Sequence, residues 1–199
     1  MTKKKPFAPS CEKNQDPILQ VLLRHLGDVT TLLEIGSGTG QHAVHMASHF
    51  PDVQWQTSEL ADKHDGLNLW LDEAHAPNIL RPVVLDVTNN QWPNTTTEAI
   101  YTANTAHIMS WTAVQSMFAG VGRLLNVGGL FCIYGPFNYN GEFTSAGNAK
   151  FDETLRSRDP ASGIRDFEAL ERLAFSGGMC LKEDAEMPAN NRFLIWQKT

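Results

Sequence analysis

Three glycines alternate with other residues in the stretch LLEIGSGTGQ, which runs from Leu32 to Gln41 and carries an acid, Glu34, just before them. Glycine loses more conformational freedom on folding than any other residue, so three of them this close together require a reason. Glycines between a strand and a helix let the backbone approach a ligand, and the free N–H groups of the helix that follows attract polar groups. The stretch therefore predicts a ligand-binding turn.

The spacing of these glycines excludes two common nucleotide sites. Gly36, Gly38 and Gly40 follow the pattern G-x-G-x-G, one residue shorter than the dinucleotide pattern G-x-G-x-x-G. No Gly-Lys-Ser/Thr follows, which excludes the phosphate-binding P-loop. A carboxylate at Glu34 would repel a pyrophosphate, but it favours a ligand that carries an ammonium or sulfonium charge. The spacing and the acid therefore both disfavour an NAD-type oxidoreductase.

Strands and helices alternate along the chain around this turn. Apolar or alternating runs predict strands over residues 31–35, 53–59, 81–87, 99–104 and 128–137. Helical spacing predicts helices over residues 41–50, 64–74, 111–125 and 167–178. Such alternation predicts a mostly parallel sheet covered on both faces. Two final runs, residues 179–187 and 192–199, are joined so closely that they must pair antiparallel.

The chain is expected to form a single domain, residues 1–199. Its first helix is predicted to begin near Asp16-Pro17, because Asp is a good N-cap and Pro suits the first helical position. Residues 1–15 are then an N-terminal arm. Residues 137–165, where Gly, Ser and Asn are frequent, are expected to form a lid or an insert that covers an acceptor.

Composition narrows the class of protein. The formal net charge of -6 argues against a general nucleic-acid binder. No apolar run approaches the ~20 residues that span a bilayer, and no apolar region follows Met1, so neither a membrane segment nor a signal peptide is expected. Cys11, Cys132 and Cys180 lack metal-ligand spacing and fit free thiols. A cytoplasmic protein is the resulting expectation.

The motif Glu34-x-Gly36-x-Gly38-x-Gly40 resembles the first motif of the class I S-adenosylmethionine-dependent methyltransferases. The resemblance covers nearly the whole chain from Leu32 onward. It implies an α/β, Rossmann-like doubly wound sheet of seven strands in the order 3-2-1-4-5-7-6, with the last strand antiparallel. It also implies S-adenosylmethionine as the cofactor.

The resemblance assigns roles to residues at the strand ends. The glycine turn would surround the amino-acid part of the cofactor, with Glu34 near its ammonium group. The two oxygens of Glu59 would accept from the ribose hydroxyls, since a carboxylate suits a vicinal diol. Asp86 would accept from the adenine amino group. The implied cofactor-binding residues are Glu34, Gly36, Ser37, Gly38, Gly40, Glu59, Leu60, Asp86, Val87 and Asn104.

The acceptor side is less defined. His107, just past the fourth strand, is the candidate base because imidazole titrates near the working pH, although a structural histidine bonded to a loop carbonyl is the alternative. Arg165 suits a bidentate pair with an acidic acceptor. The candidates for catalysis are His107, Asn104 and Tyr134, and those for acceptor binding are Trp111, Phe137, Asn138, Tyr139, Arg165 and Arg192. The aromatic residues after the fifth strand, Tyr134, Phe137 and Tyr139, could instead pack beneath a loop.

Several segments resemble a poorly characterised branch of that superfamily, the domain-of-unknown-function 938 branch, which includes methyltransferase-like 26. These segments are AHIMSW, YGPF, FDETLRSRDP, GIRD and MPANNR. The branch has no settled substrate, so the resemblance supports the cofactor more than the acceptor. We expect no nucleic acid, because the net charge is acidic and an Asn/Asp-Pro-Pro-Tyr/Phe motif is missing after the fourth strand. We expect a small-molecule acceptor, because the predicted lid would close over a pocket. A non-catalytic module that binds the cofactor or a protein is the alternative.

Three histidines share one face of the second predicted helix. His42, His45 and His49 lie at spacings of three and four residues, which suggests a metal site. No cysteine or carboxylate stands in register with them, so a solvated helix face is the preferred interpretation and no metal is expected.

Overall fold

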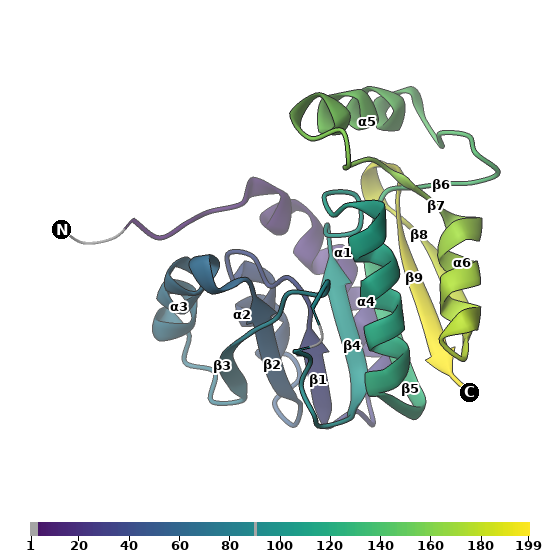
Figure 1. Cartoon of the computed structure of the whole chain (residues 1–199). Helices are drawn as coiled ribbons and strands as arrows, with labels where there is room; N and C mark the ends of the chain where they lie inside the picture. Colours follow the sequence, from purple (N-terminus) through teal and green to yellow (C-terminus); the bar gives the residue numbers. More distant parts are fainter. Residues whose placement is uncertain (1–3, 90) are drawn as a thin grey trace.

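Seven strands form one sheet in the computed structural model, which describes residues 4–89 and 91–199 (Figure 1). Their order is β3-β2-β1-β4-β5-β9-β8. The first five are parallel, and β9 pairs antiparallel with both β5 and β8. The predicted order 3-2-1-4-5-7-6 is confirmed, since β8 and β9 are the sixth and seventh strands of this sheet. The bounds are β1 Thr31–Glu34, β2 Gln54–Glu59, β3 Ile79–Val84, β4 Thr97–Ala103, β5 Leu125–Gly135, β8 Met179–Met187 and β9 Asn191–Lys198.

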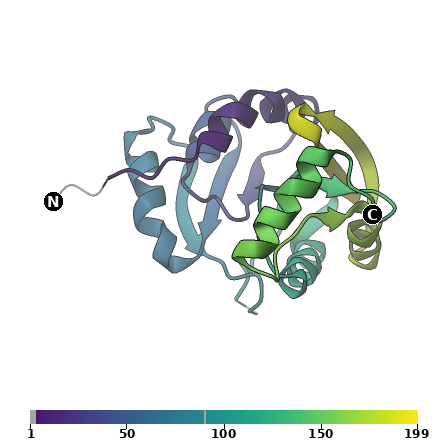
Figure 2. The same cartoon turned by 90° about the horizontal axis from the view of Figure 1, so that it is seen from above.

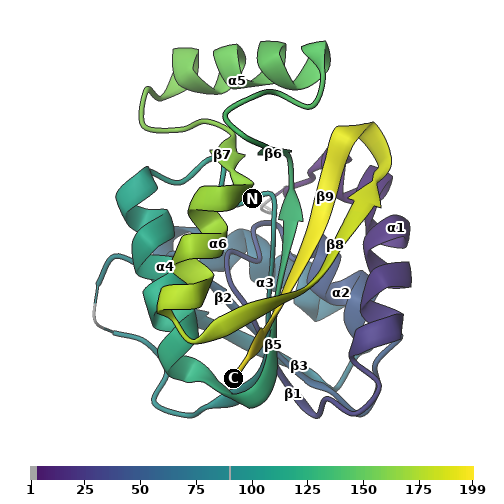
Figure 3. The same ribbon diagram turned by 90° about the vertical axis from the view of Figure 1, so that its right-hand side faces the viewer.

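Helices cover both faces of the sheet. Figure 3 shows α4 and α6 on one side and α1 and α2 on the other. The helix bounds are α1 Pro9–His25, α2 Gln41–Ala47, α3 His64–Glu73, α4 Trp111–Leu124, α5 Ala146–Arg158 and α6 Phe167–Ser176. Two short 3-10 turns, η1 Ala61–Lys63 and η2 Pro188–Asn190, and a two-stranded pair, β6 Phe137–Asn138 with β7 Arg165–Asp166, complete the fold.

The sheet divides the apolar core into two clusters. Successive strand residues point to opposite faces, so on β4 the side chain of Ile100 packs toward α4 and that of Tyr101 toward α1 and α2. Both side chains are fully buried. Because helices cover both faces, the central strands β1 and β4 are buried along most of their length.

The first helix corrects the sequence prediction. It begins at Pro9, not near Asp16-Pro17, and Pro17 lies inside it. Pro9 takes the first helical position, and the preceding Ala8 N–H donates to Gln41 Oε1 at 2.6 Å. Pro17 removes one hydrogen bond from the helix, but Ile18 and the residues that follow it are buried against the sheet and keep the helix continuous. Half of the expected arm is therefore helical.

Residues 137–165 contain a helix that apolar spacing did not predict. α5 lies beyond the carboxyl ends of the parallel strands, and seen from above it crosses the molecule over those ends (Figures 1 and 2). β6 leads toward it and β7 leads away from it. The segment is therefore placed where it can cover a site at the strand ends.

Two smaller expectations concern the cysteines and the membrane. Cys11, Cys132 and Cys180 are free thiols, as predicted. Within residues 4–89 and 91–199, no helix has the length and apolar character that crossing a bilayer requires.

Candidate functional site

The glycine turn joins β1 to α2 and takes a backbone shape that requires glycine. Gly36, Gly38 and Gly40 have φ angles of 68°, 56° and 91°, in the left-handed region that side chains disfavour. The Ser37 N–H donates to the Ser58 carbonyl at 2.9 Å, which fixes the turn beside β2. The sequence prediction of a ligand-binding turn thus has the expected backbone geometry.

Glu34 lies beneath this turn and does not line the cavity that opens above it. Its side chain is 2% exposed, and its Oε2 accepts from Ser37 Oγ and from Trp55 Nε1, both at 3.0 Å. Burial raises the pKa of Glu34 to about 7, although the two hydrogen bonds oppose that rise. A carboxyl that titrates near neutrality therefore supports the turn from below.

A cavity of about 460 Å³ opens above the turn at the carboxyl ends of β1, β2 and β4. This is the point where the strand order reverses, at which open α/β sheets bind their ligands. Eight of the residues expected to bind a cofactor line it: Gly36, Ser37, Gly38, Glu59, Leu60, Asp86, Val87 and Asn104. We call it the first cavity.

Two carboxylates face the first cavity. The Glu59 oxygens accept from the N–H groups of Gly38 and Leu60 at 3.0 and 2.8 Å, one bond on each oxygen. Asp86 Oδ1 accepts from the N–H and the hydroxyl of Thr88, and these bonds lower the pKa of Asp86. β3 ends at Val84, whereas the predicted strand extended to residue 87. Asp86 therefore sits on the loop beyond the strand.

Gly40 differs from the expectation. It does not line the first cavity; a Cβ built there would lie 2.5 Å from Leu67 Cδ1, so this glycine allows α3 to pack closely. Sequence reasoning also missed the part of the wall that comes from the N-terminus. The additional lining residues include Ala8, Ser10, Cys11, Thr39, His42, Thr88, Thr105, Ile108, Met109 and Ala113.

A second cavity of about 300 Å³ adjoins the first, and Ser10 and Asn104 line both. Asn104 has a φ of 58°, an unusual backbone for a residue with a side chain, and its N–H donates to the Tyr134 carbonyl at 2.9 Å. All three predicted catalytic residues, Asn104, His107 and Tyr134, line the second cavity. Its other lining residues are Lys13, Asn14, Pro136, Asn148, Phe151, Pro188, Ala189 and Asn191.

His107 lies in the loop after β4, with its ring against Phe151 of α5. The two ring centroids are 5.4 Å apart in an edge-to-face arrangement. Burial and, to a smaller extent, the charge of Arg165 lower the pKa of His107 to about 4. The imidazole is therefore neutral at physiological pH and able to accept a proton.

His42 corrects the prediction of a solvated helix face. It is buried, lines the first cavity, and its Nε2 lies 2.7 Å from Asn14 Oδ1. An amide oxygen only accepts, so this ring nitrogen carries the proton. Burial lowers the pKa of His42 to about 4. His45 instead pairs with Asp16, and His49 is exposed. No group of three or more potential metal ligands occurs in the described part of the chain.

Asn14 connects the two cavities. It is a buried polar residue of α1 that lines the second cavity and contacts His42 in the first. It also lowers the pKa of Tyr134, which burial raises. One side chain of the first helix therefore acts on a residue of each cavity.

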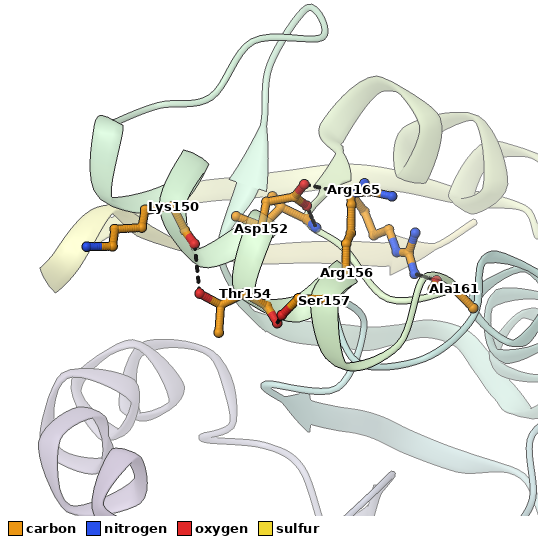
Figure 4. A network of polar contacts seen from close by, with 8 residues as sticks. Lys150, Asp152, Thr154, Arg156, Ser157, Ala161 and Arg165 are labelled. Atoms are coloured by element: carbon orange, nitrogen blue, oxygen red, sulfur yellow. Dashed lines mark hydrogen bonds and ion pairs between the residues drawn. The ribbon is translucent and has the colours of Figure 1, made fainter.

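Arg165 lies outside both cavities, and two of its three guanidinium nitrogens are bonded to backbone carbonyls. It is buried, and it donates to the carbonyls of Ala106, Met109 and Ala161. Figure 4 shows this residue beside α5, where Arg156 pairs with Asp152 at 2.6 Å. Arg165 thus fastens the loop that carries His107 to the chain that follows α5.

The remaining acceptor candidates lie outside both cavities. Phe137 is in the core, and Asn138 is buried beside it on β6. The Tyr139 hydroxyl donates to Asp184, which also pairs with Arg192 at 2.8 Å. Trp111, at the start of α4, has the Arg165 guanidinium 5.9 Å from its ring centroid. For Phe137 and Tyr139, the alternative that they pack beneath a loop fits these contacts better, whereas Tyr134 lines the second cavity.

Comparison with known proteins adds a family and a fold. The family model described as "Protein of unknown function (DUF938)" matches residues 5–198. An O-methyltransferase family protein from Burkholderia thailandensis is similar in structure, with a TM-score of 0.81 and 13% identity over 96% of this chain and 57% of that one. Human N-acetylserotonin methyltransferase, solved in complex with SAM, has a TM-score of 0.79 and 12% identity over 95% and 52%.

A third solved structure, the mitomycin 7-O-methyltransferase MmcR, gives a TM-score of 0.80 and 13% identity over 94% of this chain and 54% of that one. The present chain thus spans little more than half the length of these proteins. At such identities the likeness establishes the methyltransferase-type fold.

Proposed function

This chain belongs to the family described as protein of unknown function (DUF938), and we propose that it is an S-adenosylmethionine-dependent methyltransferase that acts on a small molecule. One observation carries the proposal. The first cavity combines the glycine turn with the carboxylates of Glu59 and Asp86, and among the described residues no lysine or arginine lines it. Such a wall favours a positively charged ligand and disfavours the pyrophosphate of a dinucleotide.

The residues of the first cavity fit the parts of this cofactor. Each oxygen of Glu59 uses one lone pair for a backbone N–H and keeps another for a ribose hydroxyl. Asp86 Oδ1 is occupied by Thr88, which leaves Oδ2 for an adenine amino group. The Gly36 to Gly38 backbone would face the amino-acid part, and buried Glu34 would lie under its ammonium group.

When bound, S-adenosylmethionine would supply a methyl group on a positively charged sulfur, which becomes a neutral thioether once a nucleophile has taken the methyl. The protein must hold that nucleophile in line and keep water away. Asn104, at the boundary of the two cavities, marks the place for it. Neutral His107 lines the second cavity and can accept a hydrogen bond from a hydroxyl acceptor, whereas a pKa of about 4 makes it a weak general base.

Residues 137–165 complete this arrangement as a cover. Asn148 and Phe151 of α5 line the second cavity from above, which supports the predicted lid. Two of the three solved structures described above are named as O-methyltransferases, and we extend that acceptor atom to this chain. The likeness to methyltransferase-like 26 remains part of the proposal and rests on segments such as AHIMSW and YGPF.

Calorimetric titration of the purified protein with S-adenosylmethionine, S-adenosylhomocysteine and NAD tests the proposal directly. We expect micromolar binding of the two adenosyl ligands and none of NAD. Glu59→Ala should weaken binding by about tenfold or more, because it removes charge-assisted hydrogen bonds. Glu171→Ala, at an exposed acid of α6 outside both cavities, is the matched control and should bind as the wild type does.

Glu59 also accepts from two backbone N–H groups, so thermal unfolding must show that Glu59→Ala is folded at the temperature of the titration. Absence of binding of both adenosyl ligands to the wild type would overturn the proposal. Binding that survives Glu59→Ala unchanged would overturn the assignment of that residue.

A further inference from the structure

The two cavities differ in charge. Glu59 and Asp86 line the first, whereas among the described residues no aspartate or glutamate lines the second. Lys13 contributes the ionic side chain of the second cavity. The chain as a whole has 22 acidic and 16 basic residues, so the charge of this wall is opposite in sign to the net charge of the chain. This wall suits a ligand with negative charge.

The first helix is responsible for that charge. Ser10, Lys13 and Asn14 are spaced three and four residues apart on α1, so they share one face, and all three line the second cavity. The helix begins at Pro9, which brings its N-terminal turn to the same wall. The positive end of the helix dipole adds to the attraction that Lys13 exerts on an anion.

Nearby acids that the structure describes do not line the second cavity. Glu12, in the first turn of α1, is exposed and lies outside it, and the acids of neighbouring elements are paired elsewhere. Asp152, on the same helix as Asn148 and Phe151, pairs with Arg156 and accepts from the Ile164 N–H at 2.7 Å. Asp184 of β8 pairs with Arg192 at 2.8 Å. Both carboxylates are therefore neutralised by partners outside the cavity.

The rest of the wall fits a flat, weakly polar body. Tyr134, His107 and Phe151 supply rings, and Pro136 and Pro188 supply rigid apolar surface. Phe151 and His107 already meet edge to face, an arrangement that a bound aromatic ring can join. The volume of about 300 Å³ is of the size that binds a small molecule.

We propose that the second cavity binds a small aromatic acid, with its carboxylate at Lys13 and its methyl-accepting hydroxyl at Asn104 and His107. The inference rests on the proposed function for the identity of the neighbouring ligand, and it adds the chemical class of the acceptor. An anionic acceptor beside a positively charged cofactor is favoured by their mutual attraction, in addition to the attraction of the lysine. Lys13 becomes the residue that selects acids over neutral analogues.

Matched pairs of an acid and its amide test this selection. Benzoate with benzamide, 4-hydroxybenzoate with 4-hydroxybenzamide, and indole-3-acetate with indole-3-acetamide are titrated calorimetrically into the protein with and without saturating S-adenosylhomocysteine. We expect at least one acid to bind about tenfold more tightly than its amide. Lys13→Met should remove that preference and Lys13→Glu should reverse it. Lys150→Met, at an exposed lysine of α5 outside the cavity, should preserve it.

The outcomes separate the two proposals. Binding of S-adenosylhomocysteine without any acid preference, or without binding of any probe at millimolar concentration, would overturn the inference and leave the proposed function intact. An acid preference that persists in Lys13→Met would overturn the inference as well. If S-adenosylhomocysteine does not bind but the Lys13-dependent preference is seen in the free protein, the proposed function fails and the anion site stands.

Discussion

Replacing Glu34 by glutamine should change how the stability of the fold depends on pH. The wild-type carboxyl is buried under the glycine turn, and burial raises its pKa from 4.5 to about 7. Between these two values the folded protein keeps a proton that the unfolded chain has released. The free energy of unfolding therefore falls as the pH rises through this window, and it levels off above pH 7.

The magnitude follows from the displacement of the pKa. A change of this size corresponds to about 3 kcal/mol of stability that the wild type has below pH 4.5 and lacks above pH 7. Glutamine has nearly the same shape and no proton to lose, and its amide oxygen can accept from Ser37 and Trp55 as the carboxylate does. Glu34→Gln should therefore gain up to about 3 kcal/mol on the wild type between pH 4.5 and pH 8.

Urea denaturation of both proteins at pH 5, 6, 7 and 8 measures this difference. Other titrating groups are common to both proteins and cancel, and any difference in packing displaces the two curves by a constant amount. The slope of the difference against pH is thus the quantity to read. A difference that stays constant over this range would refute the argument that Glu34 is buried as a carboxyl at the cost of stability.

Three further changes test the packing around the cavities. Gly40→Ala should lower the free energy of unfolding by about 1–3 kcal/mol, because its φ is 91° and the added Cβ meets Leu67; wild-type stability would contradict this. Asn14→Leu should cost about 1–3 kcal/mol by leaving the His42 ring nitrogen unpaired, and an unchanged urea midpoint would count against that contact. Arg165→Met should speed amide exchange in residues 105–109, because it removes hydrogen bonds to that loop. It should also raise the pKa of His107, which the charge of Arg165 lowers, and an NMR titration of the imidazole would show this. An unaltered imidazole titration would exclude that electrostatic contact.

The sheet and the first cavity could be predicted because their determinants are local. Each strand ends near a residue with a recognisable purpose, such as the glycine turn, Glu59 or Asn104. The carboxyl ends of parallel strands meet at one edge, so these residues had to converge. The turn at Gly36 and Gly38 could be predicted without knowledge of the tertiary structure, since its left-handed backbone conformation favours glycine.

The sequence predicted Asn104, His107 and Tyr134 in the second cavity, but it did not predict the wall that the helices supply. That wall depends on α1 and α5, whose positions come from long-range packing. The buried face of α5 consists of Asn148, Asp152 and Leu155, and two polar residues out of three leave no apolar period to detect. The contacts of Arg165 could not be predicted from the sequence either. Two of the carbonyls that it binds, those of Ala106 and Met109, lie 59 and 56 positions earlier in the chain.

The first helix forms part of the wall of both cavities, and this has a thermodynamic consequence. Any displacement of its N-terminal turn changes two binding constants at once. By linkage, the factor by which the first ligand alters the affinity for the second equals the factor in the opposite order. Cooperativity between two small molecules is thus built into the position of a single helix, and the ratio of affinities with and without the other ligand is its direct measure.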